Sequence, residues 1–311
     1  MDDRVTLSTE FFQIKTKDLI AQDFSLISTT AIDASAPYVN LGSIKNTGFD
    51  ISLGYNNTWD SGWSFNATAN VSHYKNEVTD LISAFVVGGG GLRGGAATRT
   101  EVGRSISDFY GRVVTGLDDN GRFTYEDVSG DGVINDDDRT YIGSPHPDFT
   151  YGVNLATSYK GFDASLFFSG SQGNDLYNYE KIYTDFPTFP NGNRNVRVLD
   201  SWTPSNTNTT MPALSNSISN SETNPNSFFV EDGSYLRLKN IQIGYTLKDD
   251  VVGKLGMESV RLYAVGTNLF TITGYDGIDP EVVSFDNLTL GVDNQIYPVS
   301  SMYTIGINLK F

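Results

Sequence analysis

The chain has 311 residues, no cysteine and a formal net charge of −16 at pH 7. This acidity argues against nucleic acid as a partner, and the lack of cysteine excludes disulfides and thiol chemistry. Hydrophobic residues make up 39% of the chain and aromatic residues 13%, which suits β structure, yet no apolar run approaches the length of a membrane-spanning helix.

The first predicted strand covers residues 4–15, and residues 18–46 follow as a predicted loop rich in Ser, Ala and Asn. Residues 47–74 then form a hairpin around the tight turn Trp59–Gly62, with apolar and small polar residues alternating on both arms. Because successive strand side chains point to opposite faces, this hairpin has one apolar and one polar face. Each arm has about ten residues, the length that a tilted strand needs to cross a bilayer.

The rest of the chain repeats this pattern between long polar excursions at 76–147, 169–226 and 274–300. The short turn Lys160–Gly161 joins two clearly alternating segments, and residues 248–259 connect the next two. The predicted strands of this part cover residues 149–159, 162–168, 235–247, 260–272 and 303–311. The chain thus contains about eight long strands.

The connections between these strands are very unequal in length. In an up-and-down sheet alternate connections lie at opposite ends, so all short turns share one end and all long loops the other. A soluble sandwich seldom sorts its loops in this way, whereas short periplasmic turns and long extracellular loops are typical of outer-membrane barrels. The sequence therefore predicts an all-β fold, an antiparallel transmembrane β-barrel segment. Aromatic residues at the short-turn end would form the periplasmic girdle: Tyr55, Trp59, Trp63, Tyr159, Phe162 and Tyr245.

An acidic stretch in the first large excursion matches the spacing of an EF-hand-type calcium loop. Carboxylates and a hydroxyl at alternate positions can surround a hard cation, Gly132 allows the sharp turn, and Asn135 can hold a water. The predicted calcium ligands are Asp127, Ser129, Asp131, Val133 through its carbonyl, and Asp138. The alternative is an acidic surface turn, since the last ligand is Asp rather than Glu and the flanks look extended.

No other motif suggests a catalytic or metal site. His73 and His146 are the only histidines, and their contexts do not suggest a metal pair or a catalytic triad. We therefore expect no enzymatic activity and no required cofactor beyond a structural calcium. The loop aromatics Trp202, Tyr179 and Tyr183 are able to stack on sugars, but the commoner role of such residues is to pack the loops themselves.

Several short phrases occur in a fixed order along the chain. They are NLGSIKNTGFD (40–50), DVSGDGVI (127–134), IGSP (142–145), PDFTYG (147–152), YKGFD (159–163), YLRLKN (235–240) and NLFT (268–271). Together they resemble the C-terminal barrel region of the SusC/RagA-type TonB-dependent outer-membrane transporters, over nearly the whole chain. The final Phe311 is similar to the terminal residue by which outer-membrane barrels are recognised for assembly.

The resemblance implies a barrel of 22 strands with an N-terminal plug, in the bacterial outer membrane. It also implies a SusD-like lipoprotein lid and uptake of oligosaccharides or peptides driven by the TonB complex. Signal peptide, plug and earlier strands are not seen in residues 1–311, so we expect the C-terminal part of a longer protein. Two alternatives remain: a self-contained small barrel with a structural or adhesive role, and a soluble calcium-stabilised carbohydrate-binding sandwich.

Overall fold

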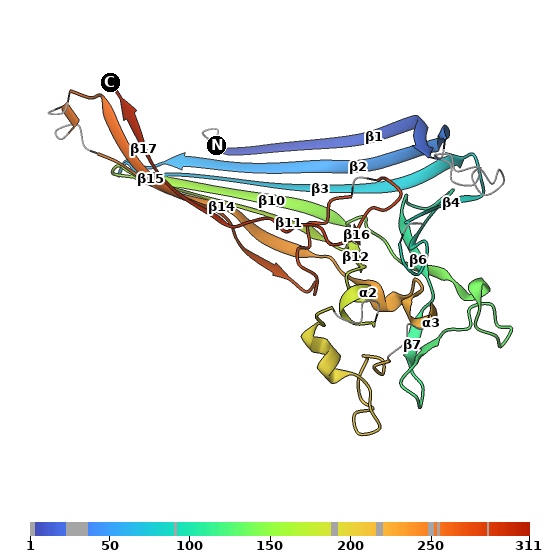
Figure 1. Cartoon of the computed structure of the whole chain (residues 1–311). Coiled ribbons are helices and arrows are strands. Elements are labelled where there is room, and N and C mark those ends of the chain that lie inside the picture. The colour runs from blue at the N-terminus through green and yellow to red at the C-terminus, as the bar shows by residue number, and fades with distance from the viewer. Residues whose placement is uncertain are drawn as a thin grey trace.

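Eight long strands form one antiparallel sheet in the order β1-β2-β3-β10-β11-β14-β15-β17. The computed structural model describes residues 4–22, 37–89, 92–187, 192–215, 220–247, 252–253, 256–284 and 286–311. The strands of the sheet are β1 (Val5–Gln22), β2 (Tyr38–Thr58), β3 (Ser64–Leu81), β10 (Phe149–Tyr159), β11 (Phe162–Gln172), β14 (Tyr235–Thr246), β15 (Ser259–Thr273) and β17 (Met302–Lys310). The sheet is long and curved, and the remaining elements gather at one end of it (Figure 1).

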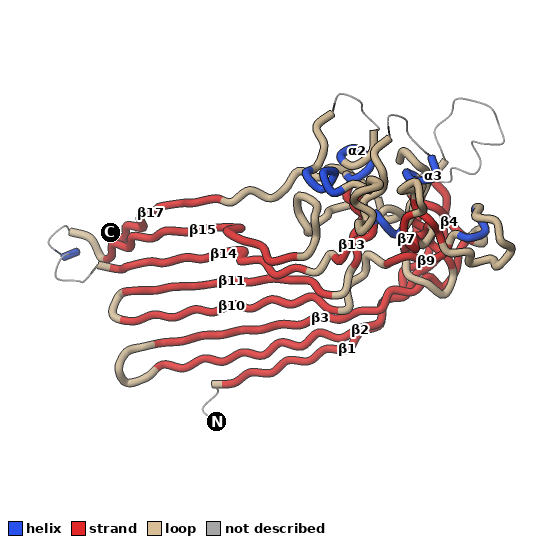
Figure 2. Tube along the Cα trace, turned by 90° about the horizontal axis from the view of Figure 1, so that it is seen from below, coloured by secondary structure: helices blue, strands red, loops and turns tan. Residues whose placement is uncertain are grey.

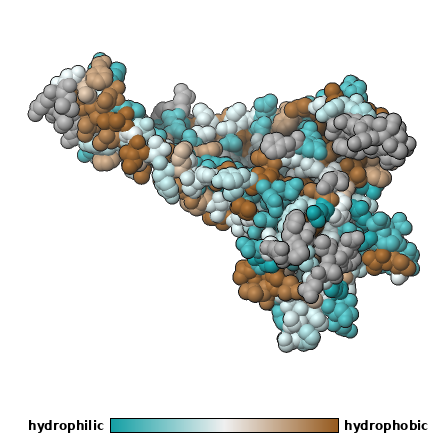
Figure 3. Space-filling model, in the orientation of Figure 1, coloured by the Kyte–Doolittle hydropathy of each residue, from teal (hydrophilic) through white to brown (hydrophobic). Residues whose placement is uncertain are grey.

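The strand register turns the local alternation into continuous apolar rows across the sheet. One row runs through Leu7, Leu53, Ala69, Val153, Phe168, Leu238 and Phe270. Most of these side chains remain open to the surroundings, with Leu53 50% and Phe270 47% exposed, whereas Leu238 is 6% exposed. Figure 3 shows hydrophobic side chains gathered over the short-turn end of β15 and β17. We call this side of the sheet the apolar face.

The connections sort to the two ends of the sheet as the sequence predicts. Residues 59–63, 160–161 and 247–258 join neighbouring strands at one end, and the described parts of the long connections lie at the other (Figure 2). The described residues of the large excursion after β3 contribute no strand to the sheet, since β3 pairs directly with β10. The predicted antiparallel architecture of about eight strands is therefore confirmed.

The predicted loop bounds were wrong at several places. β1 continues to Gln22 across a bulge, and β2 begins at Tyr38, so much of the predicted loop 18–46 is strand; residues 23–36 lie outside the described part. β3 likewise continues to Leu81 and β11 to Gln172, which shortens the predicted loops 76–147 and 169–226. Ladder pairing with neighbouring strands overrides the low β propensity of the Gly, Asn and Ser residues in these segments.

Three long connections fold together into a second body, which we call the cap: the described residues of 82–148, 173–234 and 274–301. Its strands are β4 (Phe85–Gly88), β5 (Thr98–Glu101), β6 (Asp108–Gly111), β7 (Val114–Leu117), β8 (Phe123–Tyr125), β9 (Thr140–Gly143), β12 (Asp175–Asn178), β13 (Val230–Asp232) and β16 (Val292–Asp293). Its helices are the 3₁₀ turns η1 (Asp136–Asp138), η2 (Val196–Asp200) and η3 (Ser227–Phe229), and the short α2 (Lys181–Thr184) and α3 (Asn220–Thr223).

The cap has its own hydrophobic core, to which all three connections contribute. Phe109 and Phe229 are almost fully buried, and the Phe229 ring stacks on Tyr177 with ring centroids 5.4 Å apart. Val292 from the third connection joins the same cluster. Burying one large apolar side chain contributes about 1.5–3 kcal/mol, so the shared cluster stabilises the packing of the three connections against one another. The long connections therefore form a folded unit.

The two edge strands of the sheet each have one partner. Among the described residues, β1 pairs only with β2 and β17 pairs only with β15, and the two lie at opposite edges (Figure 2). The eight strands therefore form an open sheet, which is not the closed small barrel of the alternative hypothesis. No helix in the described part of the chain is long and apolar enough to cross a membrane.

Candidate functional site

The side of the sheet opposite the apolar face carries small polar residues. One of its rows runs through Ser8, Ser52, Asn70, Gly152, Ser169 and Arg237. We call this side the polar face. Hydroxyls and amides on a barrel interior form hydrogen bonds with water and with polar solutes. They bind water and solutes only weakly, so these molecules exchange readily. Such a face suits a passage rather than a single tight site.

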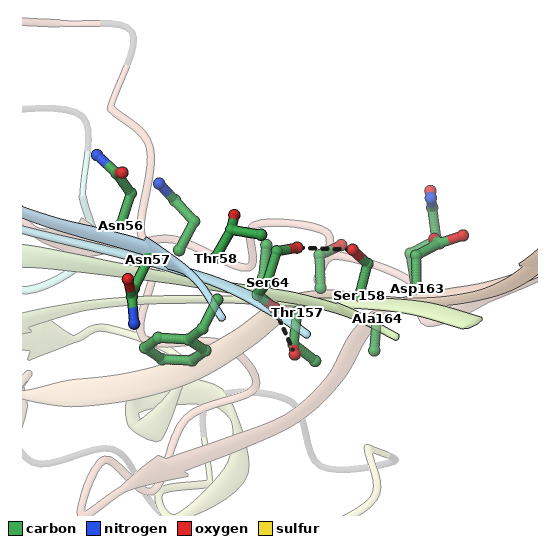
Figure 4. Close-up of a pocket in the computed structure, with 13 residues that line it drawn as sticks. Asn56, Asn57, Thr58, Ser64, Thr157, Ser158, Asp163 and Ala164 are labelled. Atoms are coloured by element: carbon green, nitrogen blue, oxygen red, sulfur yellow. Dashed lines mark hydrogen bonds between the residues drawn. The ribbon is translucent and has the colours of Figure 1, made fainter. Parts of the chain in front are cut away.

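A shallow polar pocket of about 410 Å³ lies at the short-turn end of the polar face. Figure 4 shows Ser64 and Ser158 side by side, and their Oγ atoms lie 2.6 Å apart. In the same view Thr157 and Ala164 point to the opposite side of the sheet. Most of the polar lining carries amides or hydroxyls, including Asn56, Thr58, Asn66, Ser165 and Gln242.

An ion cluster fastens the third cap connection to the polar face, and the sequence did not predict it. Arg237 of β14 is 3% exposed and its side chain pairs with Asp279, at 2.6 Å, and with Glu281. Lys239 contacts Glu281 at 2.6 Å, and the Tyr235 hydroxyl donates to the same carboxylate at 2.9 Å. The one signal in the sequence for this cluster was a charged residue, Arg237, in the middle of an alternating strand. A charge in such a place needs a partner of opposite charge when it is buried.

The electrostatics of Asp279 follow from these contacts. Burial alone would raise the pKa of the Asp279 carboxyl, but hydrogen bonds from Arg237 and from the backbone N–H groups of Glu281 and Val299 outweigh it. The pKa therefore lies below its ordinary value, and the carboxylate stays ionised. The cluster thereby holds Glu281 and Val299 of the third cap connection close to Asp279, and it holds Asp279 against β14.

A second pocket, of about 390 Å³, lies where the cap meets the outer ends of β1, β2 and β3. We call it the outer pocket. Its apolar lining consists of Phe12, Ile14, Leu19, Ile44, Tyr74, Ile106 and Leu290, and its polar lining of Asn46, Asn76, His146 and Asn287. No charged residue belongs to the described lining.

Much of the polar lining of the outer pocket is already paired. The Asn76 amide donates to Asn46 at 2.7 Å and accepts from the Ile106 N–H at 2.9 Å. His146 Nε2 lies 2.8 Å from the Ile106 carbonyl oxygen, so this nitrogen carries the proton, and Nδ1 lies 3.3 Å from the Tyr74 hydroxyl. Internal pairing leaves mainly apolar surface for a ligand to contact.

Burial controls the charges beside the outer pocket. It lowers the pKa of His146, against the opposing influence of the Ile106 carbonyl and Asp108, so the imidazole is neutral at pH 7. Burial also raises the pKa of Asp108, although the Ser144 hydroxyl and Arg104 counteract it. The pocket therefore presents no net charge of its own.

The predicted calcium loop is exposed and closes through its own hydrogen bonds. The Asp127 carboxylate accepts from the N–H groups of Gly130 and Gly132 at 2.7 and 2.8 Å. Asp138 is buried, and N–H groups from Asn135 and Ser129 hold the pKa of its carboxyl below its ordinary value.

Other members of the calcium loop behave in the same way. Asp131 accepts from the N–H of Val133 at 2.8 Å, and the Ser129 hydroxyl donates to Asp127 at 3.2 Å. Among the described residues, no three His, Cys, Asp or Glu side chains are grouped closely enough to hold a metal ion. The acidic turn is thus stabilised by backbone donors, and calcium binding stays a prediction.

The loop aromatics pack within the cap, as the commoner alternative predicted. Tyr179 is 3% exposed, its hydroxyl accepts from the Arg93 N–H, and its ring meets Tyr183 edge-on with centroids 5.5 Å apart. The backbone of Gly121 approaches the Trp202 ring so closely that a Cβ there would lie 2.7 Å from it. These rings serve packing.

The two-faced sheet, its sorted connections and its folded cap define a class: a segment of a transmembrane β-barrel together with its outer loops. Comparison with known proteins narrows this class. No family model matches the chain. TonB-dependent receptor P3 of Formosa agariphila is 32% identical over the whole chain, which covers 33% of that protein. TonB-dependent receptor SusC of Bacteroides thetaiotaomicron is 28% identical over 88% of the chain, or 27% of SusC.

Solved structures agree with these relatives. The RagAB peptide transporter superposes on the whole chain with a TM-score of 0.80 and 26% identity, over 33% of the matched chain. The RagAB peptide importer in its closed-closed state gives a TM-score of 0.81 with 26% identity. The chain spans about a third of the length of the curated relatives it matches. It belongs to the SusC/RagA-type TonB-dependent receptors and corresponds to a C-terminal portion of their barrel.

Proposed function

We propose that this chain forms part of the wall and the outer loops of an outer-membrane importer that takes up oligosaccharides or peptides. The observation that carries the proposal is the two-faced sheet, with apolar rows on one side and small polar residues on the other. TonB-dependent receptors of the SusC/RagA type are outer-membrane proteins, and the named relatives are receptors and transporters rather than enzymes. The polar face would then line the passage.

The partners follow from this placement. Outer-membrane lipid would contact the apolar face, and a SusD-like lipoprotein would close over the cap from outside. The TonB complex would supply energy through parts of the protein beyond these residues. The folded cap supports the lipoprotein contact, because a pre-ordered surface binds without the entropic cost of ordering loops. Nucleic acid is not an expected partner, since the net charge is −16.

The outer pocket is the place where this chain would contact its cargo. It opens at the outer end of the polar face, it is uncharged, and its surface is mainly apolar. Groups with an apolar face, whether a sugar ring or a peptide side chain, fit such a lining. Tyr74 and Ile44 stand on neighbouring strands at its wall.

The test is uptake by cells that carry the full-length protein. Fluorescent oligosaccharides and peptides are offered with and without a proton uncoupler. The proposal expects energy-dependent import of at least one of these cargo classes. The variant Ile44→Trp, which fills the outer pocket, should reduce import several-fold, while Leu53→Trp on the apolar face should not. Absence of import for every cargo in a correctly inserted protein would overturn the proposal.

A further inference from the structure

A groove of about 520 Å³ lies on the apolar face at the short-turn end of the sheet. Its floor is formed where Thr157 and Ala164 stand opposite each other in the β10–β11 ladder. The same cross-strand row carries Phe65 on one side and Ile243 on the other, so two small residues interrupt a row of large ones. Figure 4 shows Thr157 and Ala164 pointing to the same side of the sheet.

Aromatic side chains contribute much of the lining of this groove. Trp63, Tyr159 and Phe162 line it, and all three are more than 40% exposed. The Trp63 Nε1–H donates to the Thr157 hydroxyl at 2.5 Å, the Asp163 carboxylate in the lining pairs with Arg261, and the Ser158 hydroxyl pairs with Ser64. What remains available to a ligand is mainly apolar surface, which suits a hydrocarbon chain better than a sugar or a peptide backbone.

The described lining of this groove comes from the sheet and its short turns alone. Its strands β3, β10, β11 and β14 are interior strands, each hydrogen-bonded to a neighbour on both sides. Any further strand has to join at the free edges of β1 or β17, and the cap lies at the opposite end of the sheet. The groove therefore faces whatever surrounds the apolar face, which in the proposed membrane placement is lipid.

Charged residues lie on the two turns beside the groove. Lys160 occupies the β10–β11 turn, with its Nζ 5.0 Å from the centre of the Tyr159 ring. Asp60 lies in the adjacent turn, since the β3–β10 ladder begins with Ser64 opposite Ser158. In the described part of the chain neither Lys160 nor Asp60 has an ion-pair partner. Lys160 and Asp60 therefore place one positive and one negative charge on neighbouring turns, and these charges complement a headgroup that carries a phosphate and an ammonium.

We propose that this groove binds one acyl chain of a zwitterionic phospholipid from the adjoining leaflet, with its phosphate at Lys160 and its ammonium at Asp60. The proposal rests on the membrane placement of the proposed function. Lipid tails are about as apolar as leucine, so burial from bilayer into groove supplies no hydrophobic gain. Selectivity must therefore come from the fit of the chain over Ala164 and from the two turn charges, and these are the features that the test changes.

The experiment uses the full-length receptor in vesicles of phosphatidylethanolamine and phosphatidylglycerol. A trace of photoactivatable phosphatidylethanolamine, with the reactive group in the acyl chain, is cross-linked and the labelled peptides are mapped by mass spectrometry. We expect peptides from 157–164 to be labelled several-fold more than the surroundings of Val153 on the same face. Ala164→Phe should bring this excess down to the background, and the matched variant Ala69→Phe, outside the groove, should leave it unchanged.

The turn charges are tested separately, because exposed residues can be changed without risk to the sheet. Lys160→Gln should reduce the labelling of 157–164 by phosphatidylethanolamine several-fold, and Asp60→Asn should abolish the preference for phosphatidylethanolamine over a photoactivatable phosphatidylglycerol. Uniform labelling of the apolar face, or labelling unchanged by Ala164→Phe and Lys160→Gln, would mean annular lipid only and would overturn the proposal. Normal groove labelling in a protein that imports nothing would overturn the proposed function alone.

Discussion

Loss of the Arg237 side chain should release the third cap connection from the barrel wall. Removing one partner of a buried ion pair costs about 3–5 kcal/mol, because the other charge is left uncompensated. Glu281 would keep its contacts with Lys239 and Tyr235, and Asp279 would keep two backbone donors. The lower end of the range, about 3 kcal/mol, therefore applies to Arg237→Met.

This free energy acts on a local opening of the connection. A change of about 3 kcal/mol raises the open fraction on the order of 100-fold. Hydrogen exchange of the full-length protein reports it directly at the backbone N–H groups of Glu281 and Val299, both of which donate to Asp279. Their exchange should accelerate by about that factor.

A matched control separates this effect from a general loss of charge. Arg261 pairs with Asp163 near the other end of the sheet, and the two side chains are 22% and 33% exposed. Exposed pairs contribute about 0–1 kcal/mol, so Arg261→Met should leave exchange in the connection unchanged. Equal exchange at Glu281 in Arg237→Met and wild type would refute the argument that the cluster holds the connection.

Three further predictions concern the cap. Phe229→Ala removes a ring that is 1% exposed and should destabilise the cap by about 3–5 kcal/mol, seen as faster proteolysis there without loss of the barrel's heat-modifiable band. Acidification from about pH 7.5 to about pH 5.5 should also loosen the cap, because the folded pKa of His146 lies below its unfolded value of 6.5. The stability that the neutral imidazole contributes is complete above the unfolded pKa and is lost as the pH falls toward the folded pKa. The pKa of Asp108 is raised, so its protonation on acidification acts in the opposite direction and favours the folded cap. His146→Gln should therefore remove the loosening. If the acidic turn binds calcium, removal of calcium by a chelator should lower the temperature of the thermal transition of the cap. Titration calorimetry should then detect calcium binding that Asp131→Ala abolishes and that the control Asp119→Ala leaves in place.

The apolar and polar faces of the sheet could be predicted from the sequence because strand alternation is a local property. Whether Leu53 or Ser52 faces a given side depends only on its position in the strand, and the register then extends the same assignment across the sheet. The ends of β1 and β2 were harder to predict from the sequence. Residues such as Gly42 and Asn40 have low β propensity, and only ladder pairing keeps them in the strand.

The sites depended on tertiary structure to a greater degree. The outer pocket joins Phe12, Tyr74, His146 and Leu290, which no local pattern connects. The calcium loop was visible as a spacing, yet the same spacing serves a turn whose carboxylates accept backbone N–H groups. Spacing alone does not distinguish these two uses of Asp127, since both employ the same oxygen atoms.

Local residue patterns were enough to predict about eight alternating strands, their two faces and the sorting of short and long connections to opposite ends. Each of these follows from period-two alternation and from segment length, which neighbouring residues carry. The folded molecule was needed to show that three connections share one core, that Arg237 holds the last of them, and that two small residues open a groove among large ones. Those features depend on residues far apart in the chain, and long-range packing and strand register bring them together.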